Sequence, residues 1–159
     1  MKELTAVQAA LRAEHAAVYG YGVVGGRIAE SRKPEVRQAY DAHRARRDAL
    51  RRTVRSLGGT PAPAAAAYTL PFAVPDSAAA VRLAAELESR LAGVYADLVR
   101  ATEGARRREA ADALREAAVR SVRWKGGGVA FPGLTELGAD DAPPSPSESP
   151  SGSRAPGTL

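Results

Sequence analysis

The sequence contains no cysteine, few aromatic residues and no long apolar run, and each absence excludes a class of protein. Without cysteine the chain can form neither disulfides nor thiolate metal sites. No apolar stretch is long enough to cross a bilayer, and the N-terminus lacks the apolar core of a signal peptide, so a cytoplasmic protein without membrane contact is expected. Aromatic residues make up 5% of the chain, which leaves few platforms for stacking nucleic-acid bases.

The chain is basic, with a net charge of +5 and a pI near 10. Its 159 residues suffice for one domain with a core. The charge permits binding to RNA or the ribosome, but a diffuse excess of arginine is more often a solvated surface, so nucleic acid is not the favoured partner. The arginines that such binding would use are Arg44, Arg51, Arg52, Arg55, Arg106, Arg107 and Arg108.

The stretch GYGVVG, residues 20–25, matches the G-x-G-x-x-G fingerprint of dinucleotide-binding folds. That motif works only between a buried strand and a helix. Here the preceding residues have the apolar spacing of a helix, and no convincing strand follows anywhere in the chain. The motif therefore does not predict a nucleotide site, and no nucleophile–base pair or phosphate loop supports another enzyme class.

Apolar spacing predicts four helices, over residues 2–30, 33–57, 77–102 and 105–125. The connection over residues 58–75 is rich in proline and alanine. At about 3.3 Å per residue when extended, it can span a helix about 37 Å long, whereas the other two connections are tight. We therefore expect an all-α fold: two antiparallel helical hairpins joined by a long crossover, which is the ferritin-like form of the four-helix bundle. Residues 1–138 would form this domain with a C-terminal packing segment, and residues 139–159 a disordered tail rich in proline and serine.

Ionisable residues fall in the middle of the apolar seams of three helices. Glu14 lies in the first seam, His43 in the second and Glu88 in the third. A buried carboxylate is costly without a partner, so these groups should meet each other or an arginine. The predicted buried polar cluster comprises Glu14, Tyr21, Tyr40, His43, Arg47, Glu88 and Tyr95, with Arg46 as the alternative to Arg47.

The glycines of the first helix need a separate explanation, because glycine inside a helix costs about 1 kcal/mol relative to alanine. Gly22 and Gly26 lie one turn apart on one stripe. We expect them to mark a close contact with another helix, either in the same bundle or in a second copy. A homodimer is the expected assembly.

The two halves of the chain echo each other. Tyr21 follows Glu14 by seven positions, and Tyr95 follows Glu88 by the same interval. The arginines suggest an alignment of Arg44 with Arg120 and of Arg47 with Arg123. This pseudo-repeat is typical of a duplicated hairpin.

Several stretches together resemble an uncharacterised ferritin-like domain family of actinobacteria, a domain of unknown function. They are AEHAAVYGYGVVGGR, AYDAHRARRDALR, YTLPFAVPD, LESRLAGVYADL and WKGGGVAFPGL. The resemblance covers about residues 5–135 and implies a ferritin-like four-helix bundle, but it implies no established activity.

The chain departs from the di-iron pattern of ferritin-like proteins, in which two helices each supply Glu and two supply Glu-x-x-His. Tyr40-x-x-His43 lacks the carboxylate, and Glu116-x-x-Val119 lacks the histidine. Glu116 also falls opposite the expected apolar stripe of the fourth helix, which consists of Ala110, Leu114, Ala117, Ala118, Ser121 and Val122.

The leading hypothesis is therefore a noncatalytic bundle in which a buried Glu/His/Arg network replaces a di-metal site. No cofactor is expected. The first alternative is an oxidoreductase that binds iron or manganese through Glu14, His43 and Glu88, and the second is the basic RNA- or ribosome-associated protein. The sequence does not identify a small-molecule ligand or a physiological role.

Overall fold

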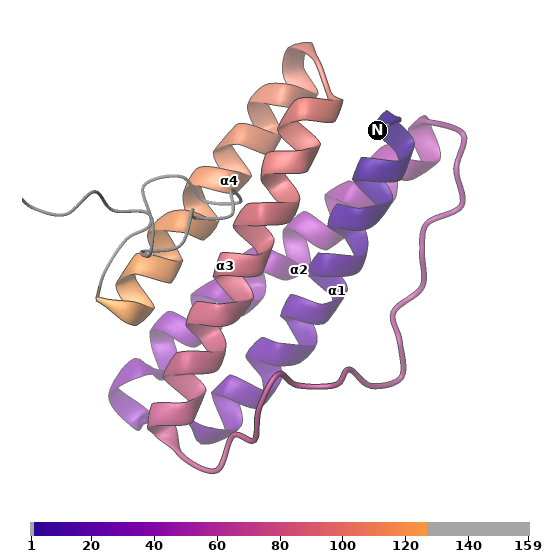
Figure 1. Ribbon diagram of the computed structural model, residues 1–159. Helices are drawn as coiled ribbons and strands as arrows, with labels where there is room; N and C mark the ends of the chain where they lie inside the picture. Colours follow the sequence, from indigo (N-terminus) through magenta and orange to yellow (C-terminus); the bar gives the residue numbers. More distant parts are fainter. Residues whose placement is uncertain (1, 127–159) are drawn as a thin grey trace, which may run out of the picture.

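Four long helices make up most of the described part of the chain. The structure is a computed structural model that describes residues 2–126. Helix α1 spans Glu3–Arg27, α2 Lys33–Ser56, α3 Ser77–Ala101 and α4 Gly104–Lys125 (Figure 1), and a short 3-10 turn joins α1 to α2. Residues 2–126 contain no strand, and the predicted all-α class is confirmed. The predicted packing segment near residue 130 and the tail over 139–159 lie outside the described residues.

Local sequence signals explain where the helices begin and end. Pro34 lies in the first turn of α2, where its missing N–H costs nothing. Asp76 caps α3 by accepting a hydrogen bond from the Ala79 N–H at 2.8 Å, an interaction typically worth about 1 kcal/mol. Gly126 ends α4 with φ 76°, a left-handed conformation that glycine adopts without steric cost.

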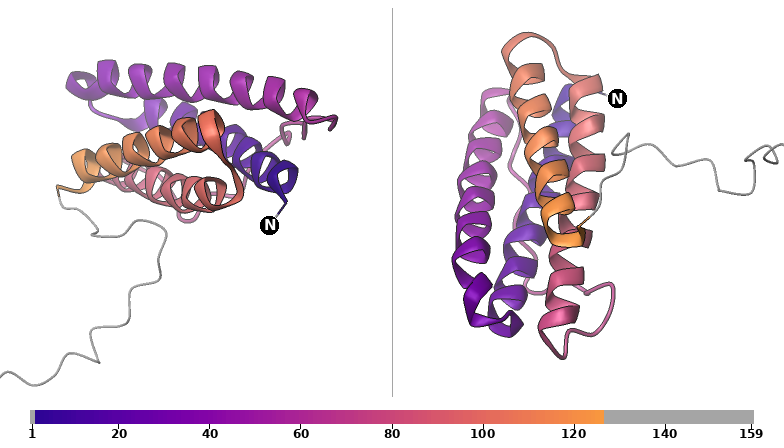
Figure 2. Two further views of the ribbon diagram at one scale, coloured as in Figure 1. Left: turned by 90° about the horizontal axis from the view of Figure 1, so that it is seen from above. Right: turned by 90° about the vertical axis from the view of Figure 1, so that its left-hand side faces the viewer.

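The helices form two antiparallel hairpins, α1–α2 and α3–α4. Helices α1 and α3 lie side by side, with α2 packed on α1 and α4 packed on α3 (Figures 1 and 2). On the remaining side, no Cα of α2 comes within 8 Å of a Cα of α4. Among residues 2–126, no helix has an apolar stretch that would reach across a bilayer.

The crossover between α2 and α3 runs back along α1 (Figure 1). Gln8 donates to the Thr60 carbonyl at 2.6 Å and accepts from the Ala62 N–H at 3.0 Å. His15 is buried, and its Nε2 lies 3.1 Å from the Ala62 carbonyl oxygen of the crossover. The crossover is therefore fixed to the helix it passes.

Two apolar clusters fill the bundle, one at each end. Leu11, Leu50 and Leu98 belong to the first, and Leu83 and Trp124 to the second. Between these clusters lie the buried polar side chains of α1, α2 and α3, so the polar groups are enclosed along the bundle axis.

The GYGVVG stretch lies inside α1, with no strand before it, as its helical surroundings predict. Gly20 marks the close approach: a Cβ built there would lie 2.5 Å from Leu87 Cδ1 on α3. By contrast, nothing lies within 4 Å of a Cβ built on Gly22 or Gly26, and both are exposed. The expected contact of Gly22 and Gly26 with a helix of the same bundle is therefore wrong, because their stripe faces away from it. A contact with a second copy stays a prediction.

Replacing Gly22 by alanine should raise the free energy of unfolding by about 1 kcal/mol, because alanine removes the helix penalty of glycine and meets no neighbour. Gly20→Ala should gain less or lose stability, because its methyl group would have to displace Leu87. Urea unfolding of both variants measures the difference. Size-exclusion chromatography at the same concentrations shows whether Gly22→Ala disturbs an assembly, which would place a second copy on this face.

Candidate functional site

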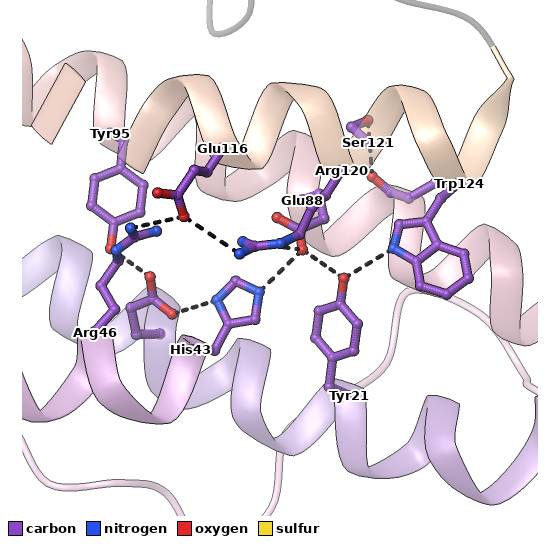
Figure 3. A network of polar contacts seen from close by, with 11 residues as sticks. Tyr21, His43, Arg46, Glu88, Tyr95, Glu116, Arg120, Ser121 and Trp124 are labelled. Carbon is purple, nitrogen blue, oxygen red and sulfur yellow. Dashed lines mark hydrogen bonds and ion pairs between the residues drawn. The ribbon is translucent and has the colours of Figure 1, made fainter. Parts of the chain in front are cut away.

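Glu14, His43 and Glu88 meet at the centre of the bundle, each at most 1% exposed. His43 Nδ1 lies 2.8 Å from Glu14 Oε2, and His43 Nε2 lies 3.1 Å from Glu88 Oε1. The imidazole on α2 therefore bridges a carboxylate on α1 and a carboxylate on α3. Figure 3 shows the polar side chains in one row along the bundle axis. The structure thus brings together the three residues that the seams place at the centre.

Two tyrosines complete the row by crossing between the hairpins. Tyr21 on α1 donates to Glu88 Oε1 on α3 at 2.5 Å. In the reverse direction, Tyr95 on α3 donates to Glu14 Oε1 on α1. Trp124 Nε1 on α4 donates to the Tyr21 hydroxyl oxygen at 3.1 Å and extends the row to the end of the bundle. Each carboxylate therefore accepts one hydrogen bond from the histidine and one from a tyrosine of the other hairpin.

The surroundings of His43 favour its protonated form. Burial alone would lower its pKa, but the hydrogen bonds and charges of Glu14 and Glu88 outweigh burial and raise the pKa of His43 to about 9. At neutral pH both ring nitrogens therefore carry protons and donate. Burial, together with the neighbouring carboxylates, raises the pKa of both Tyr21 and Tyr95, so both hydroxyl groups keep their protons.

Two arginines flank the row from α2 and α4. Arg46 Nη2 lies 3.0 Å from Glu116 Oε2, and Arg120 Nη2 lies 3.4 Å from the same oxygen. Arg120 Nη1 is buried 4.0 Å from Glu88 Oε1. Glu116 thus connects the two arginines, and Arg120 places a positive charge beside Glu88.

Two residues of the predicted cluster lie outside it. Arg47 pairs with its chain neighbour Asp48 at 2.9 Å, and Arg46, the alternative, takes the place beside the network. Tyr40 packs against the second apolar cluster near Arg44 and has no side-chain hydrogen bond within residues 2–126. Helical periodicity places a Cα on a face to within about one residue, so it does not choose between Arg46 and Arg47.

The buried face of α4 also differs from the expected stripe. Val122 is 39% exposed, whereas Trp124 is buried. The buried residues of α4 are Ala110, Ala113, Ala117, Ser121 and Trp124. Arg120, Glu116 and Trp124 are therefore contributors to the site that the predicted cluster did not include.

An internal repeat with one constant offset identifies Arg120 as the counterpart of Arg46. Glu88, Tyr95 and Arg120 stand 74 positions after Glu14, Tyr21 and Arg46, respectively. The pairing of Arg44 with Arg120 is therefore wrong by two positions. The same offset relates His43 to Ala117, so the position on α4 that matches the bridging imidazole carries a methyl group.

The geometry does not fit the dinuclear metal centre that a ferritin-like fold implies. A histidine ligand must direct one ring nitrogen to the metal at about 2.0–2.1 Å, but both nitrogens of His43 face carboxylates. Within the described residues, Glu88 Oε2 is the one buried carboxylate oxygen without a partner, and the Arg120 guanidinium lies beside that carboxylate. Among residues 2–126, no three acidic, histidine or cysteine side chains converge on a point where a metal ion could sit.

Comparisons with known proteins agree with the fold. Residues 6–136 match the model of a family described as a domain of unknown function (DUF4439). The chain is similar to a conserved hypothetical protein from Mycobacterium tuberculosis, with 37% identity and a TM-score of 0.76, over 78% of this chain and 95% of that one. It is also similar to ferritin-like, diiron-carboxylate proteins from Bacillus anthracis str. Ames, with 14% identity and a TM-score of 0.55, over 78% of this chain and 88% of that one.

The second likeness shows the fold alone, and it confirms the predicted ferritin-like bundle. No curated protein matches the chain significantly.

Proposed function

We propose that this chain, which belongs to the DUF4439 family and has the ferritin-like fold, is a noncatalytic structural or interaction protein. In this proposal the buried network of Glu14, His43 and Glu88, with Arg46 and Arg120 beside it, takes the place of a metal centre and fixes the register of the helices. One observation carries the proposal: both ring nitrogens of His43, the single histidine of the network, form hydrogen bonds with carboxylates.

The charges of the network support a structural role. Protonated His43 and Arg120 supply positive charge to Glu14 and Glu88, and Arg46 pairs with Glu116. Buried ionic groups placed in this way can specify one arrangement of helices over others. A homodimer, in which the exposed Gly22 and Gly26 stripe of α1 meets a second copy, is part of the proposal.

Metal analysis tests this proposal against the metal-binding alternative. Protein purified without a metal-chelating tag should contain iron and manganese well below one ion per chain by elemental analysis. Added Mn²⁺, or Fe²⁺ under anaerobic conditions, should leave the unfolding temperature unchanged, because only an ion that binds the folded state raises it.

Glu14→Ala is the matched variant for the same measurement. Stoichiometric iron or manganese in the wild-type protein that is lost in Glu14→Ala would establish a metal site at Glu14 and refute the proposal. Equal, low metal content in both proteins supports it.

A further inference from the structure

A groove of about 500 Å³ lies between α2 and α4, on the side of the bundle where these two helices do not touch. Figure 2 shows the two helices that border it. Its walls are largely methyl groups: Ala42, Ala45 and Ala49 from α2 face Ala110 and Ala113 from α4. The volume falls in the range of small-molecule sites, about 300–1,000 Å³, which are mostly apolar with a few polar groups.

Alanine faces normally allow helices to approach to interaxial distances of about 8–10 Å. Here α2 stays apart from α4, and two polar contacts hold it at that distance. His43 fixes it to Glu14 on α1, and Arg46 reaches across to Glu116 on α4 at 3.0 Å. The groove is therefore built into the bundle by the polar network, and closing it would require those contacts to move.

The groove is polar where it meets the network. Arg46 lines it, with 23% of the side chain exposed, and its guanidinium lies 5.7 Å from the centre of the Tyr95 ring, which also lines it. Arg46 and Arg120 share the single carboxylate of Glu116. Within residues 2–126, Arg46 donates one side-chain hydrogen bond, from Nη2 to Glu116, so its other guanidinium N–H groups can bind an additional anionic partner.

The other charges that line the groove are compensated or lie towards its rim. Arg106 is bound to Glu3, and Asp112 pairs with Arg115 at 3.1 Å. Glu109 is exposed on the first turns of α4. Beyond Arg46 the groove continues over Val7, Leu50 and Leu98. The groove thus combines a cationic end with an apolar body.

We propose that this groove is a binding site for a long-chain carboxylate, with the alkyl chain between the alanine walls and the carboxylate on Arg46. Apolar chains gain free energy by leaving water for such a surface. A carboxylate on a guanidinium forms charge-assisted hydrogen bonds, which are about twice as strong as neutral ones.

The test uses cis-parinarate, a fluorescent long-chain carboxylate, with full-length protein. Its emission should rise on addition of wild-type protein and fall when dodecanoate displaces it. Ala49→Phe fills the groove from the α2 wall and should abolish the rise, whereas Ala111→Phe, at an exposed position of α4 outside the groove, should leave it unchanged. Ala45→Leu serves as a second wall variant if Ala49→Phe does not fold, which circular dichroism shows.

Arg46→Gln tests the carboxylate end. It should weaken the binding of cis-parinarate and of dodecanoate about tenfold each. The affinity for dodecanol, calculated from its displacement curve with the variant's own probe dissociation constant, should be unchanged, because only the carboxylates use the charge. The proposal is overturned if wild-type protein does not change the probe's emission, or if Ala49→Phe and Ala111→Phe bind the probe equally. It is also overturned if Ala49→Phe changes the oligomeric state in size-exclusion chromatography, since a second copy would then occupy the groove.

Discussion

Replacing His43 by leucine is expected to destabilise the bundle by about 3–5 kcal/mol. The substitution removes the group that donates to both Glu14 and Glu88, and it leaves two carboxylates at the centre of the core. The expected loss is a large share of the total stability of a small domain, about 5–15 kcal/mol. Urea unfolding at neutral pH, followed by circular dichroism, measures it.

His15 provides the matched control, because it is also buried, and its one side-chain hydrogen bond in the described part of the chain is with the carbonyl of Ala62. His15→Leu should cost about 1 kcal/mol, the usual contribution of one hydrogen bond. Adding Glu14→Gln and Glu88→Gln to His43→Leu should recover part of the loss, because no unpaired charge then remains buried. Equal losses for His43→Leu and His15→Leu would show that the network does not stabilise the fold.

The second large effect is a loss of stability as the pH rises. Below pH 6.5, the ordinary pKa of histidine, the imidazole of His43 is protonated in both the folded and the unfolded chain, so its full contribution is present. Between pH 6.5 and about 9 the folded state holds a proton that the unfolded state has released. The free energy of unfolding therefore falls as the pH rises through this interval. The contribution is lost above pH 9. A shift of this size corresponds to about 3 kcal/mol.

Urea unfolding at about pH 6 and about pH 9.5, outside the interval set by the two pKa values, measures this difference. His43→Leu isolates the effect, because groups other than His43 titrate in both proteins. A wild-type pH dependence no steeper than that of His43→Leu would contradict the raised pKa. The imidazole resonances of His43, followed by NMR, give the titration directly.

The fold and half of the site follow from the sequence for one physical reason, the period of the α-helix. The seams of α1 and α3 contain large apolar residues, such as Leu11 and Leu91, so Glu14 and Glu88 stand out as charges within a seam. The seven-residue interval to Tyr21 and Tyr95 then places each tyrosine on the same face as its glutamate. These positions are set by backbone geometry alone.

Helix α4 was less predictable because its buried face consists mostly of alanine. Alanine is common on exposed faces as well, so the expected stripe includes Val122, which is exposed, and omits Trp124, which is buried. Arg46 was predicted only as the alternative to Arg47, and Arg120 was not predicted for the cluster, for a different reason. A long side chain can bring its charge to a site from beside the seam, so periodicity does not determine which of several arginines reaches the core.

The groove between α2 and α4 depends on tertiary distances that no local pattern encodes. Alanine at Ala45, Ala49 and Ala113 is equally compatible with two helices in contact and with two helices apart. What separates them is the reach of the His43 and Arg46 contacts, which join elements far apart in the chain.

The exchange of tyrosines between the hairpins bears on how such a chain could arise. Because Tyr21 serves the carboxylate of the second hairpin and Tyr95 that of the first, two identical hairpins could have satisfied each other as separate molecules. The position that corresponds to His43 in the second hairpin, 74 residues later, is the buried Ala117. A single chain can differ at these two positions, so one imidazole bridges both carboxylates where two identical hairpins would supply two imidazoles.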